Sequence, residues 1–213
     1  MSKFNISHDR LNAFGYLQPR DGLLPKYLGP DDVVTVVDVH MGYTFIWKGM
    51  KGTLFCDIDG TVADLTHRRV FLQSHPKNYP AFEKGIPLDT PIMPIINAVR
   101  DLYDAGWKVI MCSGRSVTTK GTTVDWLNRH EVPFHDIYMR AAHEVDETGA
   151  VKIAKSGKPK PDHRKDSIVK YELLQAARAD GHDPDIVFDD RNQVVEMWRA
   201  NGIPVVQVAE GDF

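Results

Sequence analysis

Two aspartates at the end of an apolar segment are the residues best suited to chemistry in this sequence. Asp57 and Asp59 follow the apolar segment Leu54–Cys56, and Gly60 breaks the run directly after them. Such a pair can form a turn, bind a metal ion, or supply a nucleophile and a general acid. In the last case one carboxylate forms a covalent intermediate, while the other protonates the leaving oxygen and later activates water.

Further polar residues stand where other predicted strands end. Ser113, Gly114 and Arg115 follow a second apolar segment, and Asp189 and Asp190 end a third. In open α/β sheets ligands bind at the carboxyl ends of the strands, so these groups are expected to converge on one edge of the sheet. The carboxylates gathered there would repel one another strongly without a cation, and oxygen ligands favour Mg²⁺. The Asp pair can also cap the next helix, which is compatible with metal binding.

A phosphoryl group at this edge would need positive charge and hydrogen-bond donors around its oxygens. The Ser113 hydroxyl and the backbone N–H groups after Asp57 can supply part of this need. Lys170, early in a predicted helix, is the best-placed lysine. Lys165, on a different face of the same helix, is its rival.

The elements that must position these residues alternate between strands and helices from Gly52 onwards. Apolar β-branched runs predict strands, and apolar residues at helical spacing predict helices. The alternation indicates a parallel α/β sheet covered on both faces. The expected strands are 53–58, 107–113, 136–140, 185–190 and 204–209, and the expected helices are 91–106, 118–130, 164–181 and 192–202.

The first part of the chain has a different character. Residues 1–50 are expected to form an N-terminal extension to a main domain at residues 51–213. Prolines and glycines punctuate residues 1–32, which are therefore expected to be irregular. The runs Val33–Val39 and Tyr43–Trp47 predict a β-hairpin. Exposed strand edges often pair with a partner, so this hairpin is a candidate interface for a homodimer.

Composition excludes some classes of protein. A net charge of −3 does not indicate a surface coated with base for nucleic-acid binding, although a balanced total can contain a local basic patch. No apolar run approaches the ~20 residues of a membrane span, and the first residues contain no apolar signal core. A cytoplasmic protein without a membrane partner is therefore expected. Cys56 and Cys112 are expected to be reduced thiols in the core.

The motifs, taken in order, resemble those of the haloacid dehalogenase-like (HAD) phosphatases. "DIDGT", "SGR", a helical "IVK" and "DD" match motifs I to IV of that family, over roughly residues 52–213. The resemblance implies a HAD-like, Rossmann-like parallel sheet with a small cap insert, and Mg²⁺ as the cofactor. Because a second Asp completes the DxD form, it implies phosphatase rather than dehalogenase chemistry.

The resemblance also implies a role for each position. Asp57 would be the nucleophile and Asp59 the general acid and base, while Ser113 and Lys170 would bind the phosphoryl group. Arg191 is equally compatible with a structural ion pair. The implied Mg²⁺ ligands are Asp57, the backbone carbonyl of Asp59, Asp190 and Asp189. The expected substrate contacts are Gly114, Arg115, Arg68, Arg191 and Thr61.

A closer similarity is to the 3′-phosphatase half of phage polynucleotide kinase/phosphatases and to stand-alone phosphatases of that subgroup. "RKDSIVKYELL", "FDDRNQVVEMWRANGI" and "QVAEGDF" carry this similarity. The kinase half needs a GxxxxGK[ST] loop, which "SGKPKPDH" does not match, so a phosphatase alone is expected. The predicted reaction is hydrolysis of a phosphomonoester through an aspartyl-phosphate, on polynucleotide 3′-phosphate ends or nucleotides. A nucleotidase for free nucleoside 5′-monophosphates and a non-catalytic binding module with the same fold remain as alternatives.

Two segments near the predicted site are candidates to select the substrate. Asp64–Pro91 is long enough only for a small cap, whose Tyr79 and Phe82 could stack a base or pack the cap itself. Beyond Arg140 the chain is longer than the similarity predicts, and "EVDETGAVKI" predicts a hairpin with its tip near Thr148-Gly149. A basic loop follows, which is either simply solvated or attracts phosphates; its basic residues are Lys155, Lys158, Lys160, Arg164 and Lys165.

Overall fold

The computed structural model describes residues 4–7, 33–38, 44–47, 52–73 and 75–211. The chain divides into two compact units. One contains the strands of the N-terminal part, and the other contains residues 53–104 and the chain from Lys108 onwards. Each unit is described by itself.

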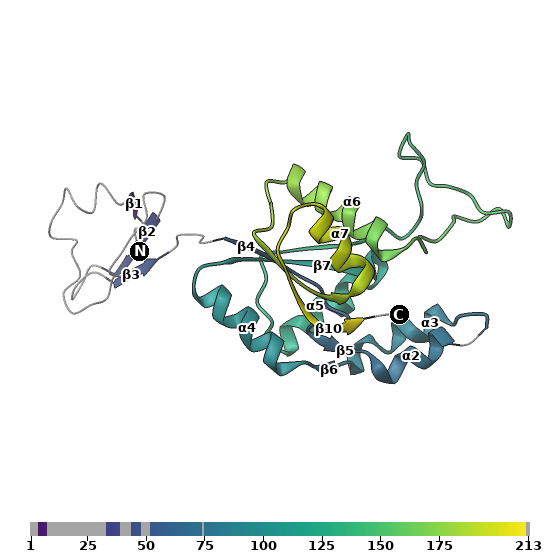
Figure 1. Cartoon of the computed structure of the whole chain (residues 1–213), viewed down its shortest axis with the longest axis horizontal. Helices are drawn as coiled ribbons and strands as arrows, with labels where there is room; N and C mark the ends of the chain where they lie inside the picture. The colour runs from purple at the N-terminus through teal and green to yellow at the C-terminus, as the bar shows by residue number, and fades with distance from the viewer. Residues whose placement is uncertain (1–3, 8–32, 39–43, 48–51, 74, 212–213) are drawn as a thin grey trace. The chain divides into compact units, whose positions relative to one another are not determined.

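The larger unit is built on a five-stranded parallel sheet (Figure 1). The first strand of the unit lies in the centre, and the chain adds strands first on one side of it and then on the other. The α/β parallel sheet predicted from the sequence is confirmed. In spatial order the strands are β10 (Val205–Gly211), β9 (Ile186–Arg191), β4 (Thr53–Cys56), β7 (Lys108–Ser116) and β8 (Asp136–Arg140).

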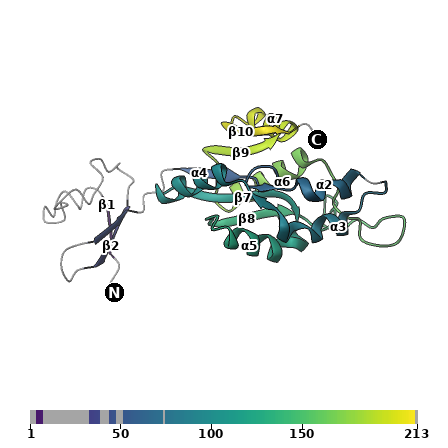
Figure 2. The ribbon, with the colours of Figure 1, turned by 90° about the horizontal axis from the view of Figure 1, so that it is seen from below.

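Helices cover both faces of this sheet because each parallel connection is a right-handed crossover. The chain moves from β4 to β7 and β8 and then returns to β9 and β10, so the first two crossover helices lie on one face and the last two on the other. Figures 1 and 2 show these layers. The helices are α4 (Met93–Asp104) and α5 (Lys120–Arg129) on the first face, and α6 (Asp166–Ala179) and α7 (Asn192–Ala200) on the second.

The core under α6 and α7 holds the sheet in place. Phe55 of β4 meets Trp198 of α7 edge to face, with ring centroids 6.2 Å apart. Val187, Leu174 and Ile110 complete this apolar cluster and are almost wholly buried. Burial of each such side chain stabilises the fold by about 1.5–3 kcal/mol. This packing holds in place the strands whose ends carry the polar residues.

Strand register aligns the ends of β4, β7 and β9. Cys56 lies beside Met111 of β7 on one side and beside Phe188 of β9 on the other. The next residue, Asp57, donates its backbone N–H to the carbonyl of Phe188 at 2.9 Å. The strand β7 continues to Ser116, beyond its predicted end at Ser113.

The two cysteines are free and buried at this level of the sheet. Burial raises the pKa of the Cys112 thiol to about 12, and it also raises the pKa of Cys56. Both therefore stay protonated at neutral pH and are inert, as expected for small core residues.

A small cap follows the first strand, as predicted. It contains two short helices, and its two ends pair as the short strands β5 and β6. Asn78 begins the second helix by accepting a hydrogen bond from the backbone N–H of Ala81 at 3.1 Å. The elements are β5 (Ala63–Asp64), α2 (Thr66–Gln73), α3 (Tyr79–Lys84), the 3₁₀ turn Ile86–Leu88 and β6 (Thr90–Pro91).

The insert after β8 forms a projecting arm, residues 141–165, drawn in green in Figure 1. Val145 pairs with Val151 around the predicted turn, which confirms the hairpin. A second turn follows that the sequence reasoning took for a plain loop, since Ile153 pairs with Pro159. At the root of the arm, His143 pairs with Pro161.

The N-terminal unit contains a three-stranded antiparallel sheet with β2 in the centre. The pairing of β2 (Val33–Asp38) with β3 (Thr44–Trp47) agrees with the predicted hairpin. The expectation that residues 1–32 are wholly irregular is wrong, because β1 (Phe4–Ser7) pairs with β2. The side chains of these strands lie outside the described residues, so the homodimer remains a prediction. Among the helices that the structure describes, none has the length and apolar character needed to cross a membrane.

Candidate active site

Two strands deliver three carboxylates to one point at the edge of the sheet. Asp57 follows β4, and Asp189 and Asp190 lie near the end of β9. One oxygen from each of the three lies within 4.8 Å of the others, and all three residues are buried. The predicted convergence of these strand ends is thus present in the geometry.

Lys170 of α6 lies between two of these carboxylates. Its Nζ is 2.9 Å from Asp57 Oδ2 and 2.7 Å from Asp189 Oδ2, and the lysine is 2% exposed. Burial alone would lower the pKa of Lys170, but Asp189 and Asp57 outweigh this effect and raise it. The rival, Lys165, precedes α6 and is exposed. Lys170 is therefore a fixed cation within the cluster.

One carboxylate oxygen of the cluster has no partner in the described part of the chain. Asp57 Oδ1 is buried and has no hydrogen-bond partner among the described residues. Burial raises the pKa of Asp57 well above its ordinary value; Lys170 opposes this, while Asp189 and Asp190 add to it. Burial also raises the pKa of Asp190, to about 6. Such shifts mark a group of carboxylates that a cation would stabilise in their ionised form.

Gly60 makes room for the cluster. Its φ is +89°, and a Cβ there would lie 2.1 Å from Asp190 Oδ2. The glycine opens a tight turn in which its N–H donates to the carbonyl of Ala63 at 2.8 Å. Thr61 follows within the turn, fully buried, and its Oγ1 has no partner among the described residues. The "DIDGT" stretch therefore needs glycine both for its backbone conformation and for the space beside Asp190.

Two arginines hold the second aspartate of the motif. Asp59 Oδ1 accepts hydrogen bonds from Arg115 Nη2 at 2.5 Å and from Arg68 Nη2 at 2.7 Å. Burial alone would raise the pKa of Asp59, but Arg115 and Arg68 outweigh this effect and lower it. Without a ligand, Asp59 is therefore ionised at neutral pH.

A second carboxylate, Asp89, pairs with the same two arginines and fixes their positions. Its Oδ2 accepts from Arg115 Nη2 at 2.6 Å, and its Oδ1 accepts from Arg68 Nε at 2.7 Å. Trp126 donates its Nε1–H to the Asp89 carbonyl at 2.9 Å. Asp89 was missed by the sequence reasoning, because an aspartate in a cap loop has no local signal that predicts a buried ion pair.

Arg68 itself is a fully buried residue of the cap. Its guanidinium carbon lies 4.1 Å from the ring centroid of Phe82, a cation–π contact. Its Nη1 has no hydrogen-bond partner among the described residues. Phe82 therefore packs within the cap, which was one of its two predicted roles. The Nη1 of Arg68 is left as an unpaired donor that a ligand could use.

A third network joins the ends of β7, β8 and β9 through Asp166 of α6. This carboxylate pairs with Arg140 of β8 through one oxygen and with Arg191 through the other. Arg140 also donates to the carbonyl of Gly114 at 2.8 Å, and a Cβ on Gly114 would lie 3.0 Å from Asp166 Oδ1. Arg191 thus takes part in an ion pair, and Gly114 is needed for close packing. Neither Arg140 nor Asp166 was singled out from the sequence.

Ser113 is fully buried at the end of the second motif. Its Oγ accepts a hydrogen bond from the backbone N–H of Arg115 at 3.2 Å. This contact fixes the turn that aims Arg115 at Asp59, while the hydroxyl hydrogen of Ser113 remains available to a ligand.

The sequence model of the polynucleotide kinase PNKP phosphatase domain matches residues 51–213. The chain belongs to this family. It is therefore a hydrolase of the phosphatase type, and the HAD-like resemblance is confirmed. The carboxylate cluster, Lys170 and the two arginines on Asp59 all lie within the matched residues.

Individual relatives of this PNKP phosphatase domain are larger than the chain. A putative bifunctional polynucleotide kinase/RNA ligase of Autographa californica nuclear polyhedrosis virus is 27% identical over 155 residues, which is 72% of this chain and 18% of the viral protein. A chain of the Pnkp1/Rnl/Hen1 RNA repair complex matches with a TM-score of 0.58 at 28% identity, over 76% of this chain and 44% of that one. A second Pnkp1/Rnl/Hen1 structure gives 0.57 and 27%, over 76% and 47%. The chain thus spans less than half the length of these relatives.

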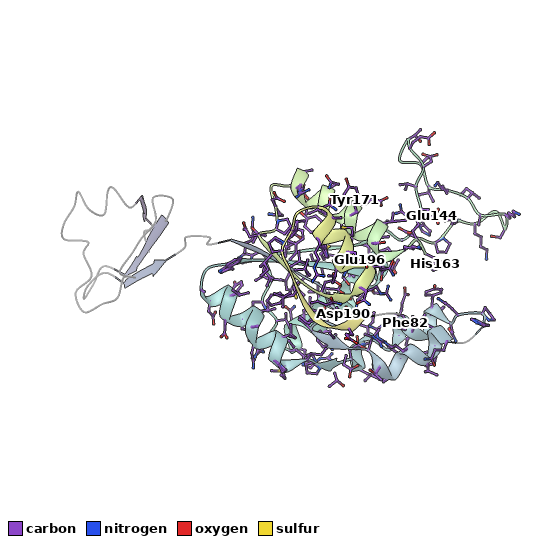
Figure 3. All side chains as sticks on the ribbon, in the orientation of Figure 1. Phe82, Glu144, His163, Tyr171, Asp190 and Glu196 are labelled. Atoms are coloured by element: carbon purple, nitrogen blue, oxygen red, sulfur yellow. The ribbon has the colours of Figure 1, made fainter. Side chains whose placement is uncertain are left out.

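The cap and the root of the arm both reach the PNKP phosphatase site. Arg68 of the cap binds Asp59, and Arg140, which binds the Arg164 carbonyl at the root of the arm, also binds the Gly114 carbonyl. Figure 3 labels Asp190 of the site, Phe82 of the cap and His163 of the arm. His163 stacks on Tyr79 of α3, with ring centroids 4.2 Å apart and planes 14° apart. Tyr79 therefore packs against the arm, and this contact joins the cap to the root of the arm.

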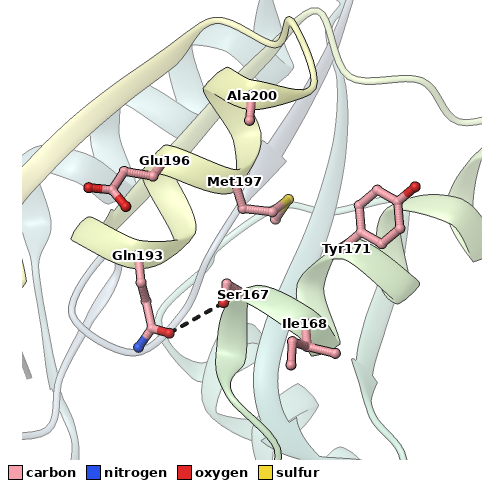
Figure 4. A pocket seen from close by; sticks show the side chains of 7 residues that line it. All are labelled: Ser167, Ile168, Tyr171, Gln193, Glu196, Met197 and Ala200. Carbon is pink, nitrogen blue, oxygen red and sulfur yellow. Dashed lines mark hydrogen bonds between the residues drawn. The ribbon is translucent and has the colours of Figure 1, made fainter.

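A separate groove lies on the outer surface between α6 and α7 (Figure 4). Its volume is about 480 Å³, and Ile168, Tyr171 and Met197 supply its apolar lining. Ser167 donates to Gln193 Oε1 at 3.3 Å across one end of it. None of the carboxylates of the cluster lines this groove, so it is distinct from the candidate active site.

Proposed function

We propose that the protein is a Mg²⁺-dependent phosphomonoesterase that acts through an aspartyl-phosphate, on 3′-phosphate ends of polynucleotides or on nucleotides. One observation carries the proposal. Lys170 holds Asp57 Oδ2, whereas Asp57 Oδ1 is buried and has no partner among the described residues. An oxygen that is held in place but unpaired is available to a phosphorus atom or to a cation.

The carboxylate cluster fits a magnesium ion. Three buried carboxylates face one lysine, so the ionised cluster lacks positive charge, and their oxygens are the ligands that Mg²⁺ prefers. Asp57, Asp190 and the backbone carbonyl of Asp59 would hold the ion. Asp189 is less available to a metal ion, because its oxygens already accept hydrogen bonds from Lys170, the Trp198 indole and the Arg191 backbone N–H. When bound, Mg²⁺ would neutralise charge on the phosphoryl oxygens.

Asp57 would attack the phosphorus atom. A bond forms between its carboxylate oxygen and phosphorus, and the bond from phosphorus to the ester oxygen breaks. Asp59 gives a proton to the leaving oxygen, which departs as an alcohol. Water then attacks the phosphorus of the aspartyl-phosphate while Asp59 takes its proton, and phosphate leaves with Asp57 restored.

The pairing of Asp59 with two arginines suits the second half of this cycle and must change for the first. An ionised Asp59 is ready to accept the proton of water, but it cannot protonate a leaving group. A phosphate dianion entering beside Arg115 and Arg68 would compete for their N–H groups. Loss of these bonds raises the pKa of Asp59, so substrate binding itself would allow it to take up the proton it later donates.

The substrate class is proposed from the family and its relatives. A relative named as a polynucleotide kinase/RNA ligase and a match within an RNA repair complex both favour a nucleic-acid end. The small cap, with short helices only, leaves room for a long substrate beside the site. A free nucleoside monophosphate would be bound by the same phosphoryl contacts, so direct comparison of substrates is required.

The nucleophile is tested by Asp57→Asn. This variant should lose all measurable hydrolysis of a generic aryl phosphate, while Asp101→Asn, on the exposed surface of α4, should behave as wild type. Unchanged turnover by Asp57→Asn would refute the assignment. If the wild-type protein and Asp101→Asn both failed to bind Mg²⁺ and to hydrolyse any phosphate ester, the alternative of a non-catalytic module would gain support.

The substrate is tested with a panel. Oligonucleotides with a 3′-phosphate, nucleoside 3′-monophosphates and nucleoside 5′-monophosphates are compared in Mg²⁺ and in EDTA. We expect the highest kcat/KM on the oligonucleotides and no turnover in EDTA. A preference for free 5′-monophosphates would favour a nucleotidase, and activity on sugar phosphates alone would overturn the nucleic-acid assignment.

A further inference from the structure

The arm, residues 141–165, is an ordered structure rather than a loose loop. Three of its residues bond mutually through their backbones: Glu144 N–H to the Lys160 carbonyl at 2.9 Å, Lys152 N–H to the Glu144 carbonyl at 2.9 Å, and Lys160 N–H to the Lys152 carbonyl at 2.8 Å. The buried Glu144 carboxylate accepts from Lys160 Nζ at 2.8 Å. These bonds fix the two turns of the arm relative to each other.

The root of the arm is fastened to the active site. Arg140 donates to the carbonyl of Arg164 at 2.9 Å while it also pairs with Asp166. Arg164 in turn binds the buried Asp162 at 2.8 Å and Glu172 of α6 at 2.5 Å. On the other side, the Tyr79–His163 stack ties the root to the cap. The direction in which the arm leaves the domain is therefore set by contacts on both sides of its root.

The two turns of the arm carry opposite charge. The first turn contains Asp146 and Glu147, and the segment from Lys152 to Lys160 contains four lysines and no acidic residue. Two of these lysines pair with Glu144, at 2.8 and 3.8 Å. Lys155 and Lys158, at the second turn, are exposed and have no ion-pair partner within the described residues. We call this turn, residues 154–158, the basic turn.

If the basic turn were simply solvated, the exposure of its lysines would be explained. The separation of these lysines from the acidic residues of the first turn would not be. The acidic residues that could neutralise Lys155 and Lys158 lie on the first turn, and the mutual backbone bonds at Glu144, Lys152 and Lys160 keep the two turns apart. Two exposed lysines without an acidic partner among the described residues are available to a polyanion. Lysine binds phosphate as a point charge without a demand on base identity, which suits contact with a nucleic-acid backbone.

We propose that the basic turn binds backbone phosphates of the substrate strand, upstream of the 3′ end whose phosphate lies at Asp57. This inference rests on the proposed polynucleotide substrate and deepens it. The cap binds Asp59 through Arg68, and the root of the arm is held by Arg140, which also binds the Gly114 carbonyl. The arm projects from the domain (Figure 3), and a strand with its end in the site would run along it. The contact favours long substrates over mononucleotides and is independent of sequence.

The test compares Lys155→Ala/Lys158→Ala with a control of equal charge change, Arg178→Ala/Arg199→Ala. The control residues lie in the last turns of α6 and α7, at the opposite edge of the sheet from the site. For each protein, kcat/KM is measured on a 3′-phosphorylated single-stranded oligonucleotide and on a nucleoside 3′-monophosphate across a range of salt. Two lost phosphate contacts should reduce the slope of log(kcat/KM) against log[salt] by about 1.4.

The slope change makes the expected result specific. The deficit of the Lys variant on the oligonucleotide should shrink about sevenfold between 50 and 200 mM salt, which follows from the same slope. Its activity on the mononucleotide should equal that of wild type. Equal slopes for the Lys variant and the control would overturn the inference while leaving the proposed function intact. Failure of the wild-type protein to act on the oligonucleotide would instead refute the proposed substrate, and the inference with it.

Discussion

Replacement of Gly60 by alanine tests whether the "DIDGT" turn is shaped by the carboxylate that it faces. The glycine has a φ of +89°, and a Cβ built on it lies 2.1 Å from Asp190 Oδ2 and 2.6 Å from Asp190 Cγ. Asp190 is 2% exposed, so its side chain cannot move aside into solvent. The change should therefore act on both the backbone and the metal site.

Two costs add. A left-handed backbone conformation costs an L-residue about 1–2 kcal/mol. The clash with a buried side chain adds about 1–3 kcal/mol, as for other overpacked sites. We therefore expect Gly60→Ala to lower the free energy of unfolding by about 2–5 kcal/mol. Displacement of the Asp190 carboxylate should also raise the Mg²⁺ concentration for half-maximal activity by about 10–100-fold, as for other misoriented metal ligands.

Gly121→Ala is the matched control. Gly121 lies within α5, and a Cβ there would meet nothing within 4 Å. Alanine should stabilise this helix by about 0.5–1 kcal/mol, the opposite sign to Gly60→Ala. Urea unfolding in EDTA measures the stability of both variants, and Mg²⁺ titration of aryl phosphate hydrolysis measures the metal effect. Equal stability and equal Mg²⁺ requirement of Gly60→Ala and wild type would refute the reasoning.

Two further predictions concern buried charge. Lys170→Met should lower the free energy of unfolding in EDTA by about 3–5 kcal/mol, because its two carboxylate partners remain buried without a cation; a change below about 1 kcal/mol in urea unfolding would contradict this. Arg164 lowers the pKa of Asp162 against the raising effect of burial. The stabilisation by Asp162 is thus present above the unfolded pKa of about 3.9 and is lost as pH falls through the lower folded value. The stability difference between wild type and Asp162→Asn should therefore shrink from pH 7 to acid pH, and a constant difference would argue against this ion pair.

Local patterns in the sequence were sufficient for the strands of the five-stranded sheet, the helices that cover it and the residues at strand ends. β-branched runs and helical spacing reflect which faces are buried, so they predicted the parallel sheet and the helices on both sides of it. The same reasoning brought Asp57 and Asp190 to one edge, because parallel strands end together, and Lys170 was chosen as the best-placed lysine early in its helix. The family match supports the reaction class but leaves the role of each residue to the experiments above.

Contacts between residues far apart in the chain had no such local signal. Asp89 lies in a cap loop, yet it aligns Arg68 and Arg115, and Asp166 joins Arg140 to Arg191 in the same way. An ion pair depends on where side chains meet after folding, and sequence spacing does not encode that for different elements.

The cap and the arm show the same division. The small size of the cap followed from its length, but only the tertiary structure decided that Phe82 packs on Arg68 and that Tyr79 stacks on His163. The basic residues of the arm were evident in the sequence, whereas their separation from the acidic turn arises from backbone bonds between Glu144 and Lys160. Composition thus determined which charges and rings are present, and packing decided which of them remain free to bind a ligand.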